Sequence, residues 1–142
     1  MKFRDYFSLK QILFAVAIVG LMMLFAVNNS NNIVKVKLQD ESVSITSSKY
    51  NISIDYADIV SVSLEDLAEP GVEKENCHDD KMIRTGIWEN GIWGTYYICA
   101  DLDVDNCVVV YLQDGRTFVF SRKSNAETEK IYQALLTHLK TA

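Results

Sequence analysis

An unbroken apolar run lies near the amino end of the chain. Residues 12–27 carry no charge and no strongly polar side chain, and Gly20 stands in their middle. A helix of this length covers roughly 24 Å, so flanking residues such as Leu9 are needed to approach the ~30 Å hydrocarbon core of a bilayer. We expect an uncleaved transmembrane helix over residues 9–27, preceded by a short basic flank over residues 1–8.

Two other interpretations of this run are a buried core helix and a cleaved signal peptide. A helix that is apolar on every face needs a large protein around it, and only roughly 115 residues follow the run. A signal peptide needs small residues at its cleavage site. Cleavage after Ala26 would place Leu24 three positions from the cut, which argues against a secreted domain released by cleavage.

The cations on the two sides of the run indicate an orientation. Lys2, Arg4 and Lys10 precede it, whereas Lys35 and Lys37 are the nearest that follow. Because the more basic flank tends to stay in the cytoplasm, this three-to-two bias favours a cytoplasmic amino terminus. We expect a single-pass protein of the cell membrane with its folded domain on the extracytoplasmic side, by a narrow margin.

Beyond a polar tether over residues 28–32, apolar residues recur at every second position. This period is typical of half-buried strands. In the segment over residues 59–65, Val60 would face the core and Glu65 would face the solvent. The pattern predicts strands over residues 34–38, 43–45, 50–54 and 59–65.

The rest of the domain opens with an acidic stretch, residues 65–80, whose Pro70-Gly71 pair indicates a long surface loop. Asp114-Gly115 is a strong hairpin signal because both residues tolerate positive φ. We expect a three-stranded antiparallel meander made of residues 95–100, 107–113 and 117–121.

A helix is predicted at the carboxyl end, over residues 125–140. Ser124 and Glu127 have the spacing of a capping box, in which a hydroxyl and a carboxylate satisfy amides at a helix start. Ile131 and Leu135 belong to an apolar stripe at helical spacing. The helix should therefore pack against the sheet.

The order of these elements resembles the bacterial pleckstrin-homology-like domains. The resemblance covers roughly residues 33–139, through the segments ISIDYADIVSVSLED, IRTGIWENGIWGTYY and VVVYLQDGRTFVFS and the final helix. It implies a mostly β fold over residues 33–142, a barrel or sandwich of about seven antiparallel strands closed by one C-terminal α-helix. It also implies a binding or scaffolding role rather than catalysis. The matching positions are Arg84, Gly86, Gly91, Gly94, Asp114 and Gly115.

Composition and charge narrow the choice of partners. Of 142 residues, 49% are hydrophobic and 23% charged, which is ordinary for a globular protein, and the net charge of −5 gives no reason to expect nucleic acid. Residues 55–105 hold thirteen acids and three bases, a local charge of −10. Because a phosphoinositide site needs clustered Lys and Arg, we do not expect phosphoinositide binding.

The segment GIWENGIWG supplies the candidate partner patch. It repeats Gly-Ile-Trp, which places Trp88 and Trp93 five residues apart, with Arg84 nearby. Exposed, these three residues would form an aromatic patch for a partner protein or the membrane interface. The alternative is that one or both tryptophans fill the core.

The three cysteines are Cys77, Cys99 and Cys107. They include no C-x-x-C pair, so the sequence offers no zinc site. If residues 95–100 and 107–113 pair symmetrically, Cys99 stands opposite Cys107 with Cβ atoms about 4.5–5.5 Å apart, and outside the cytoplasm the two can form a disulfide. The alternative is that both remain reduced thiols.

One further motif points to metal chemistry. Asp101, Asp103 and Asp105 mimic the start of a calcium loop, but Asn106 replaces the required Gly and Leu112 the bidentate Glu. These departures exclude an EF-hand, and a solvated hairpin tip, with at most weak adventitious Ca²⁺ binding, explains the same residues. We expect no metal and no cofactor.

We therefore expect a membrane-anchored, non-catalytic binding module whose partner is a protein at or in the membrane. Alternatives are a secreted or periplasmic domain, a subunit of a larger membrane assembly, and an enzyme that uses Cys77 or a loop carboxylate.

Overall fold

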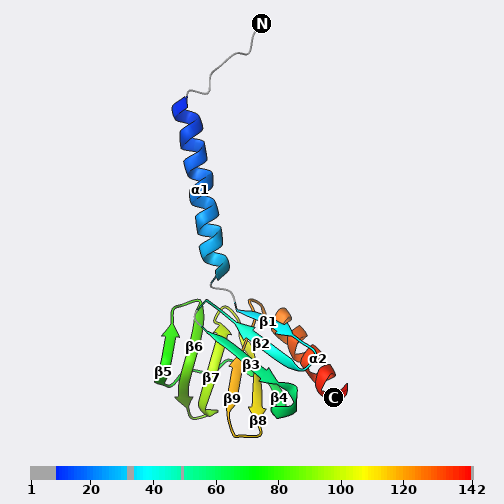
Figure 1. The fold of residues 1–142 in the computed structure, drawn as a ribbon. Coiled ribbons are helices and arrows are strands. Elements are labelled where there is room, and N and C mark those ends of the chain that lie inside the picture. Colours follow the sequence, from blue (N-terminus) through cyan, green and yellow to red (C-terminus); the bar gives the residue numbers. More distant parts are fainter. Residues whose placement is uncertain (1–8, 32–33, 49, 142) are drawn as a thin grey trace. The chain divides into compact units, whose positions relative to one another are not determined.

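The chain divides into two units, Met1–Asn31 and Asn32–Ala142. The computed structural model describes residues 9–31, 34–48 and 50–141 (Figure 1). Within these residues the first unit holds one α-helix, and the second holds nine strands, a short 3-10 helix and an α-helix.

The first helix, α1 (Leu9–Asn31), contains the whole apolar run. It continues about one turn past the run, so residues 28–31, expected in a tether, are helical. Its side chains are described from Gln11 to Met23, and all of these are exposed. Among the described residues, no helix is long and apolar enough to cross a membrane. This finding does not support the transmembrane helix expected over residues 9–27.

The domain begins with a small antiparallel sheet in which β2 lies between β1 and β3. Val36, Ile45 and Ile52 follow one another across the three strands, and the last two are buried. The opposite face carries Lys35 and Lys37, both exposed. The alternating pattern therefore predicted these strands well: β1 (Lys35–Leu38), β2 (Ser42–Thr46) and β3 (Asn51–Asp55).

The other six strands form a second sheet in the order β4-β8-β9-β7-β6-β5. A short 3-10 helix (Tyr56–Asp58) leads from β3 into this sheet. The strands are β4 (Ile59–Asp66), β5 (Val72–Asp79), β6 (Ile83–Asn90), β7 (Gly94–Asp101), β8 (Asn106–Leu112) and β9 (Thr117–Phe120).

The expected meander of β7, β8 and β9 is wrong in its order. β8 and β9 do form the antiparallel hairpin that Asp114-Gly115 predicted. However, β9 lies between β8 and β7, and it pairs with β7 in parallel through Tyr97 and Phe118. The sheet is therefore mixed, not antiparallel throughout.

The number of strands also differs from the expected seven. Two strands, β5 and β6, occupy the stretches assigned to an acidic loop and to the Gly-Ile-Trp repeat. β5 is an edge strand with few buried side chains, and its pairing with β6 shifts register on both sides of Glu75. Since β5 lacks alternation of apolar and polar residues, its sequence carries no signal of a half-buried strand.

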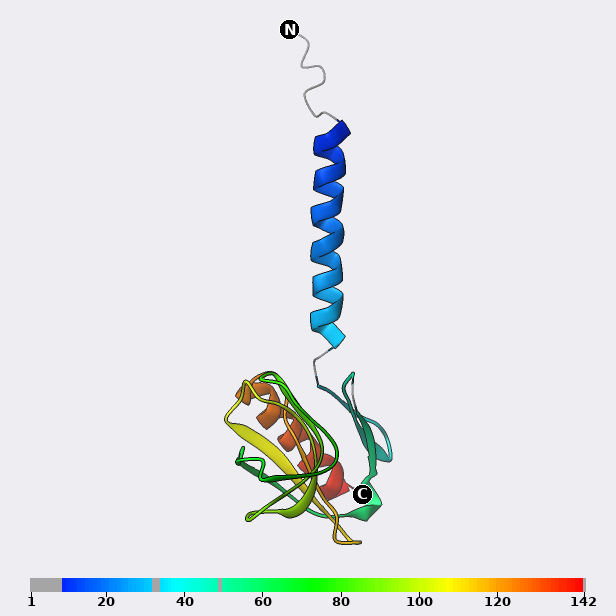
Figure 2. The ribbon, with the colours of Figure 1, turned by 90° about the vertical axis from the view of Figure 1, so that its left-hand side faces the viewer.

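The main core lies between the two sheets and is closed by α2 (Asn125–Thr141) (Figure 2). α2 contacts β8 and β4, and its Leu135 is fully buried. Ser124 Oγ accepts a hydrogen bond from the backbone N–H of Glu127 at 3.2 Å, which confirms the hydroxyl half of the predicted capping box. The Glu127 carboxylate pairs with Arg122 and Lys123. A mostly β domain with one closing C-terminal helix is thus confirmed.

Candidate functional site

The proposed partner patch is not an exposed aromatic surface. Trp88, on β6, has only 3% of its surface exposed, and Trp93, in the β6–β7 turn, has 7%. Both belong to a second core on the face of the large sheet that points away from β1–β3. The expectation of an exposed patch was therefore wrong, and the alternative, that the tryptophans fill the core, is confirmed.

Trp93 links the β6–β7 turn to the edge strand β4 through Glu65. Its indole Nε1–H donates a hydrogen bond of 2.7 Å to Glu65 Oε2, and its ring packs edge-on against Tyr96. Glu65 lies on β4, and Oε1 of the same carboxylate accepts hydrogen bonds from the hydroxyls of Ser63 and Tyr111. We call Ser63, Glu65, Trp93 and Tyr111 the Glu65 cluster; the sequence had placed Glu65 in solvent.

The hydrogen bonds of the Glu65 cluster favour a charged carboxylate. Burial raises the pKa of Glu65, but the three donors outweigh it and leave the pKa below its usual value. Burial, together with the charge of Glu65, raises the pKa of the neighbouring Cys107 thiol to about 12. A carboxylate already occupied by three donors is suited to fixing structure rather than to accepting protons from a substrate.

We predict that Glu65→Gln destabilises the domain by about 1–3 kcal/mol, because the hydrogen bonds would lose their charged acceptor. Since the folded pKa of Glu65 is lowered, its stabilisation is present above the unfolded pKa and is lost as pH falls through the folded value. Urea unfolding should therefore show that the free energy of unfolding falls more between pH 7 and pH 3 in the wild type than in Glu65→Gln. Equal losses in the two proteins would contradict a charged Glu65.

A segment between β4 and β5 covers the second core, and we call residues 67–71 the strap. Its backbone carbonyls are held by side chains of β6 and β7. Arg84 Nη1 donates to Ala68 O, Asn90 Nδ2 to Glu69 O at 3.1 Å, and the Tyr96 hydroxyl to Pro70 O at 2.8 Å.

Arg84, the third residue of the proposed patch, therefore has a role within the fold. Its Nε donates to Asp79 Oδ2 at 2.9 Å, and its guanidinium carbon lies 5.8 Å from the centre of the Trp88 ring. These contacts leave the side chain mostly buried. The structure thus brings Arg84 and Trp88 together, as the sequence suggested, but beneath the strap instead of at the surface.

The proposed disulfide between Cys99 and Cys107 is not formed, and all three cysteines are free thiols. β9 separates β7, which carries Cys99, from β8, which carries Cys107. The two thiols also point to opposite faces of the sheet, since Cys99 lies in the main core and Cys107 in the second. Burial raises the pKa of Cys99 to about 11, so neither buried thiol is activated.

The turn between β7 and β8 is held by a local hydrogen bond and by another to the start of α2. Asp101 Oδ1 accepts from the N–H of Asp103, and Asn125 Oδ1 accepts from the N–H of Asp105 at 2.9 Å. These contacts are those of a capped turn. Among the described residues, no three His, Cys, Asp or Glu side chains are grouped as a metal site would require.

The point where the chain enters the domain is fixed by an arginine that the sequence analysis did not single out. Arg122, between β9 and α2, donates a hydrogen bond from Nη1 to the carbonyl of the fully buried Val34. Its other nitrogen lies 3.4 Å from Glu127 Oε2. Lys35 and Lys37 follow at once on β1, so exposed cations gather near this entry point.

Comparison with known proteins does not extend this description. The chain matches no family model, and neither the curated proteins nor the solved structures give a match.

Proposed function

We propose that the chain is a membrane-anchored β domain that acts as a binding or assembly module and not as an enzyme. The observation that carries the proposal is the exposure of α1. Between Ile12 and Met23, nine large apolar side chains are exposed, among them Phe14 and Leu21 at 70% and 73%. Exposing so many apolar side chains to water is unfavourable, so the helix requires lipid or partner helices around it.

The described polar groups support a non-catalytic role. The carboxylate of Glu65 accepts three hydrogen bonds, all from donors within the protein. The buried thiols of Cys99 and Cys107 have raised pKa values, which disfavours the reactive thiolate. The domain shares two sheets and a closing helix with the pleckstrin-homology-like outline, but the parallel β7–β9 pair departs from it. We therefore transfer only the expectation of a binding role.

The anchor is tested by extraction and flotation of the full chain. We expect the protein to remain with membranes in alkaline carbonate and to float with zwitterionic vesicles, because the apolar side chains of α1 prefer lipid. Val16→Lys combined with Val19→Lys should release it, since each charge costs about 2.5–3.5 kcal/mol at the centre of a membrane helix. The matched control is Gln11→Lys, at the edge of the apolar run, which should stay bound.

Two readouts separate the alternatives. Intact mass of the mature protein distinguishes an anchor from a cleaved signal, because cleavage would remove the apolar run. We propose an extracytoplasmic domain, and reporters fused to Ala142, one active only after export and one fluorescent only in the cytoplasm, test that side. Release of the wild-type protein by carbonate would overturn the anchor.

A further inference from the structure

The formal charges of the domain are segregated between its structural parts. Among the described residues, the part made of residues 34–55, which include β1–β3, and residues 121–140 has six basic and five acidic side chains, a net charge of +1. Residues 56–120, which include all of the large sheet, have four basic and thirteen acidic side chains, a net charge of −9. We call these the basic part and the acidic part.

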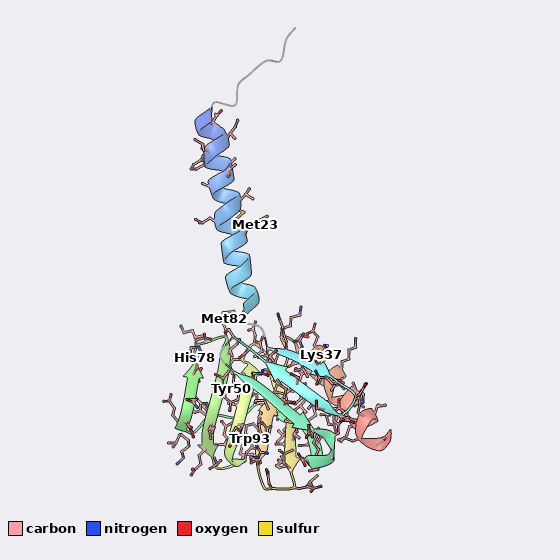
Figure 3. All side chains as sticks on the ribbon, in the orientation of Figure 1. Met23, Lys37, Tyr50, His78, Met82 and Trp93 are labelled. Carbon is pink, nitrogen blue, oxygen red and sulfur yellow. The ribbon has the colours of Figure 1, made fainter. Side chains whose placement is uncertain are left out.

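The cations of the basic part are accessible. Lys35 and Lys37 are exposed on the same face of β1, spaced about 7 Å apart along the strand. Lys123, next to Arg122, is also exposed. In Figure 3, Lys37 lies on the side of the domain away from His78, which is on the acidic edge strand β5.

Covalent connectivity brings these cations close to the proposed anchor. Only residues 32–34 separate the end of α1 from Lys35, and the four steps from Asn31 to Lys35 span at most about 14 Å. The hydrogen bond from Arg122 to the carbonyl of Val34 holds the first residues of the domain next to the segment that precedes α2. Because β1 is the first strand after α1, Lys35 and Lys37 are held closer to the proposed anchor along the chain than the cations of any other strand.

We propose that the basic part faces an anionic phospholipid surface and that the acidic part faces the aqueous phase. An anionic surface attracts each nearby Lys or Arg, and the effect falls off within a Debye length of about 8–10 Å. Sheets pack about 10 Å apart, so the acidic large sheet lies largely outside this range when β1–β3 face the lipid. The inference rests on the proposed anchor, and it leaves the edge strand β5 and the acidic face open to a partner.

Lysine acetylation of the full chain, read by mass spectrometry, tests this orientation. The chain supplies its own controls, since Lys74 and Lys81 lie in the acidic part and are exposed. In bilayers with 30% phosphatidylglycerol, compared with pure phosphatidylcholine, we expect acetylation of Lys35 and Lys37 to slow about fivefold, the ratio equivalent to ~1 kcal/mol per cation at an anionic surface. Lys74 and Lys81 should be unaffected, and 0.5 M salt should remove the difference.

A pair of variants tests whether the charges cause the effect. Lys35→Glu with Lys37→Glu should abolish the lipid-dependent protection of Lys123, whereas Lys74→Glu with Lys81→Glu should leave it. Equal acetylation of both lysine sets in a protein that still floats with phosphatidylcholine vesicles would overturn the orientation alone. Protection of Lys74 and Lys81 instead would also overturn it. Failure to float with those neutral vesicles would overturn the anchor, and the orientation with it.

Discussion

Gly71→Ala should destabilise the domain by about 3 kcal/mol or more, because the new methyl group would meet the backbone of β6. A Cβ atom at this position would lie 2.0 Å from the carbonyl oxygen of Glu89, a contact that no rotamer change relieves. Gly71 also has a φ of +81°, which L-residues rarely adopt. The strap would have to move off the second core.

Two other glycines are matched controls for this substitution. Gly115 has a similar φ of +87° but no atom within 4 Å of its would-be Cβ, so Gly115→Ala should cost only about 1–2 kcal/mol of backbone strain. Gly91 has open space and no positive φ, and Gly91→Ala should be nearly neutral. Urea unfolding of the full chain in mild detergent, followed by tryptophan fluorescence, gives the three values. A Gly71→Ala protein as stable as Gly115→Ala would contradict the close approach of the strap to β6.

Leu135→Asp should leave the domain unfolded under conditions where the wild type is folded. Leu135 is fully buried in the main core, so the substitution both removes an apolar side chain and buries a carboxylate with no partner. Loss of the side chain alone, as in Leu135→Ala, costs about 2–5 kcal/mol. The total stability of most domains is only about 5–15 kcal/mol.

Gln133→Asp is the control for charge and helix propensity, because Gln133 is exposed on the same helix. It should change stability by no more than about 0.5 kcal/mol. Thermal melting followed by near-UV circular dichroism measures tertiary packing directly. If Leu135→Asp melted like Gln133→Asp, the packing of α2 between the sheets would be refuted.

The second core had a signal in the sequence of β8. Val108, Val109 and Val110 are consecutive and all fully buried, with Val109 in the second core and its two neighbours in the main core. A continuous apolar strand indicates that both faces of its sheet are covered. That inference would have favoured buried positions for Trp88 and Trp93.

The order of strands had no comparable signal. A period of two assigns each side chain to a face, but it does not say which strand lies beside which. β9 could therefore be predicted as a strand, while its place between β7 and β8 could not. That placement alone decides that Cys99 and Cys107 do not meet, although the hairpin geometry assumed from the sequence would have paired them.

The sequence by itself determined the features that depend on near neighbours in the chain. These are the apolar run of α1, the alternation of β1–β3, the Asp114-Gly115 hairpin, and the cap and apolar stripe of α2. In β4 the predicted alternation was wrong, since Val60 is exposed and Glu65 is half-buried. Only the tertiary structure decided that Glu65 meets Trp93, 28 residues away, and that the strap closes over the second core. Contacts of this kind depend on how whole strands are ordered and curved in a sheet, because local patterning fixes which face a residue is on but not which distant residue it meets.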